Sequence, residues 1–488
     1  MMTDSHLRKA LHAFLAVGAA FVLGVGCTTG GDRGVLLERR LDALGLDAWE
    51  PGRTPAAGQS TARGGLEVVS GEYDLAGVLN TALANNLSLR AALLRRDEAL
   101  GAIEEARAAA YPALTLGGGV TSDLVERDDT PDTYAATLSL TQPLWRSGAI
   151  GAGIRYAGLH AANVDEGIRA EMQAVVARVS GDYLDVLLAK HMVDVYQESV
   201  NVAERMLDTA KKKRAAGSAS DYEVLRAEVE VASSRAALIK EQNALRTAGI
   251  RLLQGMGVDQ SSRIAISGAL TYRPETNNTD EVILSALVNR PDILQAQAAV
   301  GMAEESVKLV RSQYGPSADL FANGRYQNPD PNDPAQDKWN HDAAAGVNVT
   351  LTLFDGFERH GRLRQAESRL AQARAALRQA EESARVDVVR ALLAIRDADE
   401  LYLSQAKNID LSREALRMLE NGFKVGRNTQ IEVLDARSAL TEAMGQYYKA
   451  IHAHSLARIE VRKAAGTLVA PAGAPPVRAG MQVGEEPF

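Results

Sequence analysis

Two close pairs of ionisable side chains are the first candidates for chemistry in this sequence. Glu432 and Asp435 lie three positions apart, which places both carboxylates on one face of a helix. His452 and His454 are two positions apart, so on a helix they point to different sides and are poorly placed to share a metal ion. The sequence holds no Ser/His/Asp set and no phosphate-binding loop. We therefore expect no catalytic residue, no metal site and no cofactor.

The distribution of proline indicates which elements carry these residues. None of the 15 prolines lies between Pro143 and Pro274 or between Pro334 and Pro471. A proline inside a helix removes a hydrogen bond and clashes with the preceding turn, so long helices can form in these two windows. The 488 residues are 46% hydrophobic, which is typical of an ordered protein, and the net charge of −8 argues against a nucleic-acid partner.

The chain repeats itself after about 200 residues. The segment 217–227 matches the segment 426–436, with glycine, the tripeptide Glu-Val-Leu and alanine in the same places. We therefore divide the chain into a signal peptide (1–26), an N-terminal extension (27–70), a first repeat (71–262), an inter-repeat equatorial segment (263–280), a second repeat (281–468) and a flexible C-terminal tail (469–488).

Each repeat has the pattern of a helix, a strand pair and a long helical hairpin. Leucines from Leu79 to Leu100 predict a first helix that ends at Pro112. Apolar and small polar side chains then alternate over 134–141 and again over 347–353, which is typical of strands with one apolar face. We expect strand pairs at about 114–145 and 318–354, and helical hairpins at about 147–256 and 356–466.

The two hairpin tips carry matching helix-end signals. Gly217 and Gly426 each allow the left-handed conformation that ends a helix. Ser220 with Glu223, and Thr429 with Glu432, have the spacing of a capping box for the returning helix. Both tips are therefore predicted to be tight turns.

Cys27 is the single cysteine, so no internal disulfide can form. Residues 1–26 have the positive start and apolar run of a secretory signal, and the segment 23–27 (Leu-Gly-Val-Gly-Cys) resembles a bacterial lipobox, whose cysteine is lipidated. Thr28 follows, where an aspartate would retain such a lipoprotein in the inner membrane, so we expect lipidation of Cys27 and an outer-membrane destination. The alternative is a chance cysteine in a cleaved leader or in a simple anchor.

Four amphipathic strands are too few to close a membrane barrel, because the smallest known type has about eight. An open strand edge is intolerable in lipid. Strands of about ten residues suit a tilted crossing of a bilayer. Several chains would therefore have to pool their strands around a wet lumen.

The ordered set of motifs resembles the TolC-type outer-membrane efflux proteins. It comprises Gln142-Pro143-Leu144-Trp145, Leu353-Phe354-Asp355-Gly356 and the tip motif at 426–436, within residues 71–468. The resemblance implies a mainly α fold with a small transmembrane β-barrel: a homotrimer whose twelve-stranded barrel continues as a twelve-helix periplasmic tunnel. It also implies a periplasmic adaptor (membrane fusion) protein and an inner-membrane pump, of the RND type above others, as partners. With the lipobox, the chain is similar to the lipoprotein branch, anchored in outer-membrane lipid on the periplasmic side.

The resemblance also assigns residues. Glu432 and Asp435 take the place of the periplasmic gate, although Glu432 equally fits the capping box, and Arg226 stands at the position of Asp435 in the first repeat. Phe423 and Asn428 replace a tyrosine and a basic residue common in the family, which puts a tyrosine-based lock in doubt. The positions implied in adaptor docking are Gly217, Ser218, Ser220, Gly426, Arg427 and Thr429.

Trp145 and Phe354 are predicted to end their strands, either as aromatics of the membrane interface or as helix-packing residues. The overall prediction is a passive exit duct for small molecules, drugs or metal ions, and not an enzyme. The alternatives are a periplasmic coiled-coil adaptor or structural lipoprotein, which would ordinarily have one hairpin between β-rich halves, and the exit duct of a type I protein secretion system. The sequence does not indicate which substrate is exported.

Overall fold

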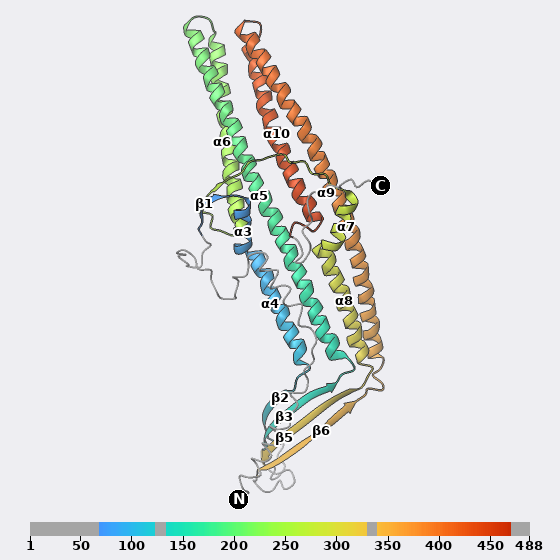
Figure 1. Cartoon of the computed structure of the whole chain (residues 1–488). Coiled ribbons are helices and arrows are strands. Elements are labelled where there is room, and N and C mark those ends of the chain that lie inside the picture. Colours follow the sequence, from blue (N-terminus) through green and yellow to red (C-terminus); the bar gives the residue numbers. More distant parts are fainter. Residues whose placement is uncertain (1–67, 123–132, 329–338, 470–488) are drawn as a thin grey trace, which may run out of the picture. The chain divides into compact units, whose positions relative to one another are not determined.

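The structure, a computed structural model, describes residues 68–122, 133–328 and 339–469, all within one compact unit that spans residues 62–470. In chain order the elements are β1 (Ser70–Tyr73), α3 (Leu75–Asn85), α4 (Leu87–Ala108), β2 (Ala113–Thr121), β3 (Thr133–Trp145), α5 (Ala149–Ala215), α6 (Asp221–Met256), β4 (Arg263–Ile266), α7 (Thr279–Asn289), α8 (Pro291–Ser312), β5 (Ser317–Asn328), β6 (Asn340–Thr350), α9 (Glu358–Lys424) and α10 (Gln430–Ala464). The second repeat follows the first: two short helices, two strands and a helical hairpin (Figure 1). The predicted mainly helical, duplicated fold is confirmed.

The two hairpins contain the longest elements. The helices α5 and α9 each have 67 residues, which corresponds to about 100 Å of helix. Each packs along its returning helix, and α5 also packs along α10, so the hairpins lie side by side with both tips at one end (Figure 1). The proline-free windows therefore hold the long helices predicted for them. None of the helices in the described part of the chain is both long and apolar enough to cross a membrane.

Each short helical segment before the strands is broken in two, which differs from the single helix predicted in the first repeat. Asn86 ends α3 and caps α4, and Arg290 separates α7 from α8. The Asn86 side chain accepts the backbone N–H groups of Ser88 and Leu89 and donates to the carbonyl of Gly255 on α6. The prediction of one helix was wrong because the leucine spacing continues through this break, whereas the tertiary bond to α6 favours it.

Glycines end both returning helices against these breaks. Gly257, after α6, has φ +69°, and a Cβ there would lie 2.8 Å from the carbonyl carbon of Asn85. Gly466, after α10, has φ +72°, and its Cβ would lie 2.7 Å from the carbonyl carbon of Asn289. A side chain fits at neither position, so both repeats join the hairpin to the short helices by the same close backbone approach.

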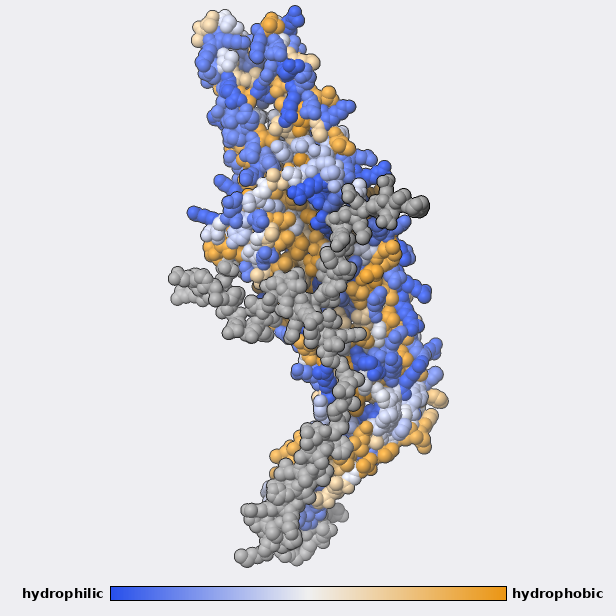
Figure 2. Space-filling model, in the orientation of Figure 1, coloured by the Kyte–Doolittle hydropathy of each residue, from blue (hydrophilic) through white to orange (hydrophobic). Residues whose placement is uncertain are grey.

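The four longer strands form one antiparallel sheet in the order β2-β3-β5-β6. Its register pairs Leu116 with Leu138 and Leu320 with Val347, which places apolar side chains on one face. Many of these side chains are exposed, and apolar residues gather over the strands in Figure 2, whereas the hairpin tips are mainly hydrophilic. The predicted alternation of an apolar and a small polar face is therefore present.

Strand β6 ends at Thr350, four residues before the predicted end of the strand pair. Thr350 pairs with Ser317, the first residue of β5, so the residues after it have no neighbouring strand. Strand β3 reaches Trp145 because Trp145 pairs with Ala318 of β5. The prediction that Phe354 ends a strand was therefore wrong.

A small parallel sheet was not predicted at all. Strand β1 pairs with β4, which ties the start of the first repeat to the segment between the repeats. Side chains of both strands, including Tyr73 and Ile266, pack on the main hydrophobic core around Leu252 and Met256. Four residues with a glycine in β1 give too short a pattern to identify a strand.

Candidate functional site

The first tip is a tight turn between α5 and α6. Gly217 has φ +73°, and its N–H donates to the carbonyl of Arg214 at 2.9 Å. The N–H of Ser218 donates to the carbonyl of Lys213, also at 2.9 Å, which completes the Schellman pattern of a helix end. The predicted glycine-ended turn is confirmed.

The cap of α6 is only half of the predicted capping box. The Ser220 hydroxyl accepts the N–H of Glu223 at 3.3 Å, but the Glu223 carboxylate does not accept the Ser220 N–H in return. Asp221 instead contacts Arg214 across the turn, with 2.5 Å between Oδ1 and Nε. Two carboxylates, those of Asp221 and Glu223, still lie in the first turn of α6, at its positive end.

The second tip has the complete capping box. The Thr429 hydroxyl accepts the N–H of Glu432 at 3.3 Å, and the Glu432 carboxylate accepts the N–H of Thr429 at 2.7 Å. Gly426 has φ +75°, and the N–H of Arg427 donates to the carbonyl of Gly422 at 2.8 Å. The Glu432 carboxylate is therefore engaged in a local helix cap.

Asp435 is placed differently from Glu432. It lies one helical turn further along α10 with an exposed side chain, and within the described residues it makes no hydrogen bond or ion pair. The two carboxylates predicted for a gate thus differ in their contacts, since that of Glu432 caps α10 and that of Asp435 faces solvent. All six residues predicted for docking are exposed at the tips: Gly217, Ser218, Ser220, Gly426, Arg427 and Thr429.

The tips of the two hairpins touch through a cation and an aromatic ring. The Lys213 ammonium lies 4.4 Å from the centroid of the Phe423 ring. A cation over an aromatic face is attracted by the ring quadrupole. Phe423 has no hydroxyl to donate, so this contact does not depend on a phenol hydrogen bond.

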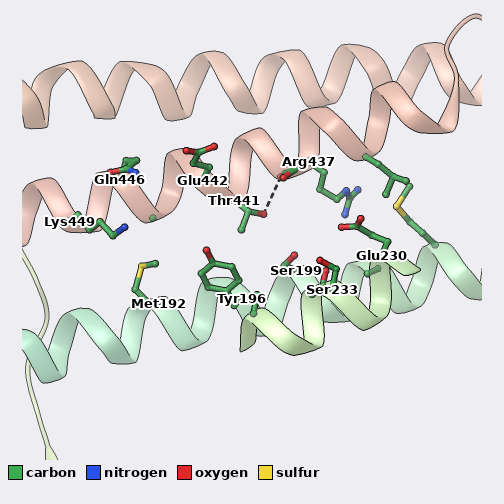
Figure 3. A pocket seen from close by; sticks show the side chains of 17 residues that line it. Met192, Tyr196, Ser199, Glu230, Ser233, Arg437, Thr441, Glu442, Gln446 and Lys449 are labelled. Carbon is green, nitrogen blue, oxygen red and sulfur yellow. Dashed lines mark hydrogen bonds between the residues drawn. The ribbon is translucent and has the colours of Figure 1, made fainter. Parts of the chain in front are cut away.

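A polar hollow of about 360 Å³ separates the hairpins below the tips (Figure 3). Helices α5 and α6 line one side and α10 lines the other, with hydroxyl groups from Tyr196, Ser199, Ser233, Ser234, Ser438 and Thr441. Arg437 points toward Glu230 across the hollow, while its guanidinium forms an ion pair with Glu420 of α9. Burial, together with the carboxylates of Glu241 and Glu442, raises the pKa of Tyr196, so its hydroxyl stays protonated at neutral pH.

At the lower end of the hollow the hairpins pack closely. A Cβ on Gly445 of α10 would lie 3.3 Å from Cε of Met192 on α5. His452 Nε2 lies 2.7 Å from an Asp185 oxygen on α5, whereas His454 Nε2 lies 3.0 Å from an Asp399 oxygen on α9. The prediction that the two histidines point to different sides is confirmed. In the residues that the structure describes, no three His, Cys, Asp or Glu side chains are grouped as metal ligands would be.

The duplicated architecture agrees with one family model. The model of the outer membrane efflux protein family matches residues 78–258 and again residues 282–467, one match to each repeat. The chain belongs to the outer membrane efflux protein family. The family predicted from the motifs is thereby confirmed, together with export as the function and the outer membrane as the location of this efflux protein.

Relatives of this efflux protein agree in length and fold. Outer membrane protein TolC of Vibrio cholerae is 26% identical over 84% of this chain and 94% of its own length. The probable outer membrane lipoprotein SilC of Salmonella typhimurium is 25% identical over 74% of this chain and 79% of its own. A solved structure of CusC has a TM-score of 0.69 at 20% identity, covering 86% of this chain and 98% of that one.

Two aromatic residues of the efflux protein flank the junction of sheet and hairpins. Trp145, 58% exposed, is the last residue of β3, and Phe354, 73% exposed, lies beyond β6 with its ring edge-on to Phe357 at 5.7 Å. Their membrane-interface role stays a prediction. Cys27 and the signal peptide lie outside the described residues.

Sequence reasoning missed the residues between the hairpins of the efflux protein. The hollow and the packed seam combine α5, α6 and α10, which no local periodicity brings together. A weak signal exists in the small residues that interrupt the helical pattern there, namely Ser233, Ser234 and Gly445. Such residues inside a helix indicate a close approach or a polar gap.

Proposed function

We propose that three copies of this efflux protein form a passive exit duct in a tripartite export system. The observation that carries the proposal is that β2 and β6 each pair on one side only within the described sheet. Unpaired strand edges are not tolerated in lipid, and β6 of one copy can pair with β2 of the next. Three copies then supply a closed sheet of twelve strands, with its apolar face toward lipid and its polar face around a wet lumen.

The helices support the same assembly. Because α5 and α10 pack together, α6 and α9 form the outer sides of the hairpins. Each presents exposed apolar side chains at helical spacing: Leu225, Val229 and Ile239 on α6, and Leu393, Leu411 and Met418 on α9. An apolar stripe of this kind is stable only when another element covers it. We assign that cover to the α9 of one copy and the α6 of the next, which gives a tunnel of twelve helices.

The partners follow from the tips and the amino terminus. The six exposed tip residues are the proposed docking site for a periplasmic adaptor protein, which serves an inner-membrane pump of the RND type: Gly217, Ser218, Ser220, Gly426, Arg427 and Thr429. The division into repeats at 71–262 and 281–468 belongs to the same proposal. Lipidation of Cys27 would anchor each copy in outer-membrane lipid, in support of which the relative SilC is described as a lipoprotein.

The duct acts without catalysis, and its pump supplies the energy. In a three-copy ring the tips bring three Asp435 side chains near one another, and rings of carboxylates attract cations and narrow a pore. We therefore propose Asp435 as the principal gate residue, with Glu432 as a second carboxylate whose first role is the cap. Small molecules, drugs or metal ions, are the proposed cargo, with secreted protein as the alternative.

The assembly is tested by a matched pair of variants on neighbouring residues of β2. Leu116 lies on the apolar face and Thr115 on the polar face. Leu116→Lys puts a charge in lipid at a cost of about 2–4 kcal/mol at the bilayer midplane, so the yield of assembled protein should fall. Thr115→Lys should assemble normally and lower the cation selectivity of the pore.

The measurements are the mass of the detergent-solubilised assembly and the conductance in planar bilayers. For the parent protein, the proposal expects an assembly with the mass of three chains and a measurable conductance in planar bilayers. A monomer without conductance would overturn it. Recovery of the protein with inner membranes would overturn it as well. Equal effects of the two lysine variants would contradict the assignment of the sheet faces.

A further inference from the structure

Six aromatic rings form a continuous chain across the molecule at the lower end of the hollow. The consecutive centroid distances are 4.7 Å from His454 to Tyr272, 3.8 Å from Tyr272 to Tyr402, 5.6 Å from Tyr402 to Tyr447, 5.6 Å from Tyr447 to Tyr448 and 4.5 Å from Tyr448 to His191. Ring pairs at such distances stabilise a fold beyond the area that they bury. Aromatic residues make up only 5% of the sequence, so their concentration here is a specific feature.

The ring chain joins four parts of the molecule. Tyr272 belongs to the segment before α7, Tyr402 to α9, and His191 to α5, while the other three rings lie on α10. The contact between Tyr448 and His191 joins the two hairpins, and the contacts of Tyr272 with Tyr402 and His454 join the inter-repeat segment to the second hairpin. Above these contacts the hollow separates the hairpins, up to the contact between Lys213 and Phe423 at the tips.

A histidine lies at each end of the ring chain. His454 is fully buried, and its Nε2 is 3.0 Å from an oxygen of Asp399, to which the Tyr272 hydroxyl also donates at 2.9 Å. Burial lowers the pKa of His454, and the attraction of Asp399 only partly opposes this effect. Burial likewise lowers the pKa of His191, whose ring stacks on Tyr448 at an interplanar angle of 6°.

The other charged and titratable groups do not remove the cost of a proton at either end. His454 faces Asp399 of α9, Glu275 and Tyr272 of the inter-repeat segment and Arg458 of α10; His191 faces Tyr448 of α10 and Asp194 and Lys190 of α5. The Glu275 carboxylate is already paired with Arg458 and Arg462. A protonated His454 would thus share one carboxylate oxygen with the Tyr272 hydroxyl inside a packed site.

We propose that the six rings form a proton-sensitive clasp, which holds the second hairpin on the first while its terminal histidines are neutral and loosens when they are protonated. Loosening lets the hairpins separate across the hollow. The clasp is complete above about pH 6.5, the ordinary pKa of histidine, and weakens as the pH falls below it, because the loosened state binds the proton more tightly. The inference concerns contacts within one copy and does not depend on the proposed trimer or its partners.

The width of the hollow provides the test. Spin labels on the pair Ser233→Cys and Ser438→Cys, placed in the full-length membrane protein, report the separation of α6 from α10 by double electron–electron resonance. A sample with Ser438→Cys alone accounts for signals between copies and from Cys27, the one native cysteine. We expect the distance distribution to lengthen or broaden between pH 7.5 and pH 5.0.

Matched histidine variants decide whether the clasp causes that change. His454→Gln cannot be protonated, so the pH-dependent change in distance should fall to less than half. His360→Gln, at an exposed position on α9 outside the ring chain, should keep the full response. If His454→Gln does not fold, His191→Gln, at the half-buried end, takes its place with the same expectation of a reduced response.

Two results would overturn the clasp. One is a parent protein whose distances are equal at both pH values, and the other is a full response in the assembled His454→Gln or His191→Gln protein. Loss of the trimeric mass or of conductance, with an intact histidine-dependent response, would instead count against the proposed duct.

Discussion

Arg437 on α10 and Glu420 on α9 form an ion pair at the repeat position where the first hairpin pairs Glu228 with Lys211. Glu420 and Arg437 follow Lys211 and Glu228 by 209 residues each, so the two pairs correspond. Their charges are exchanged, because the cation lies on the long helix α5 in the first hairpin and on the returning helix α10 in the second. The Lys211 ammonium lies 3.2 Å from Glu228. Each hairpin is therefore closed below its tip by one ion pair between its own two helices.

The first prediction concerns this pair. Arg437→Glu should destabilise the second hairpin by about 1 kcal/mol, because it replaces attraction by repulsion between partly exposed groups. The double variant with Glu420→Arg should recover most of the loss, since it recreates the polarity of the first hairpin. Thermal unfolding and the rate of proteolysis near residue 426 measure both effects. A double variant as unstable as the single one would show that the pair contributes nothing.

The second prediction compares two glycines with positive φ. Gly426 has φ +75° and open space around the Cβ position, so Gly426→Ala should cost about 1 kcal/mol from backbone strain alone. Gly257 has φ +69° and also meets the backbone of Asn85, so Gly257→Ala should lower the unfolding temperature at least twice as much. Equal shifts in the unfolding temperature for the two variants would mean that the backbone of Asn85 moves away from the new Cβ with no loss of stability.

The comparison of these glycines shows what the sequence could and could not reveal. Gly217 and Gly426 were predicted as helix ends because the signals for a glycine cap lie within a few residues of one another. The long helices and the alternating strands were predictable for the same reason, since their periodicity is local. The role of Gly257 was not, because it depends on Asn85, a residue distant in sequence that forms the other side of the contact.

The same distinction holds for the candidate site. The tip residues and the two carboxylates of α10 could be predicted because the repeat fixes their place at the turn. The ring chain from His454 to His191 could not, since it takes one tyrosine from the segment between the repeats and one from α9. Phe354 was misplaced because strand length depends on the neighbouring strand and not on the alternation of the strand itself.

The third prediction is a pH dependence at Glu275. Burial alone would raise the pKa of Glu275, but Arg458 and Arg462 outweigh burial and hold it below its ordinary value. A lowered carboxylate pKa adds stability above the ordinary value of about 4.3, and this stability is lost as the pH falls through the lowered pKa. Glu275→Gln should therefore lower the unfolding temperature at pH 7, by an amount that becomes smaller as the pH falls below about 4.3. A constant difference between the two proteins at every pH would exclude an ionic contribution.

The last prediction separates the two carboxylates of the second tip, which share a helix face but differ in their contacts. Asp435→Asn removes an exposed charge without a partner, so the unfolding temperature should stay unchanged while the cation selectivity of the reconstituted pore falls. Glu432→Ala removes the return bond to the Thr429 N–H, so it should destabilise α10 by about 1 kcal/mol.

Glu432→Gln provides the control for that pair, because it keeps an acceptor for the Thr429 N–H and removes only the charge. If the cap is the main role of Glu432, this variant should retain most of the stability and nearly the full selectivity. Unchanged selectivity in Asp435→Asn would reject Asp435 as a gate residue. A loss of selectivity in Glu432→Gln as large as in Asp435→Asn would show that both carboxylates line the narrow part of the pore.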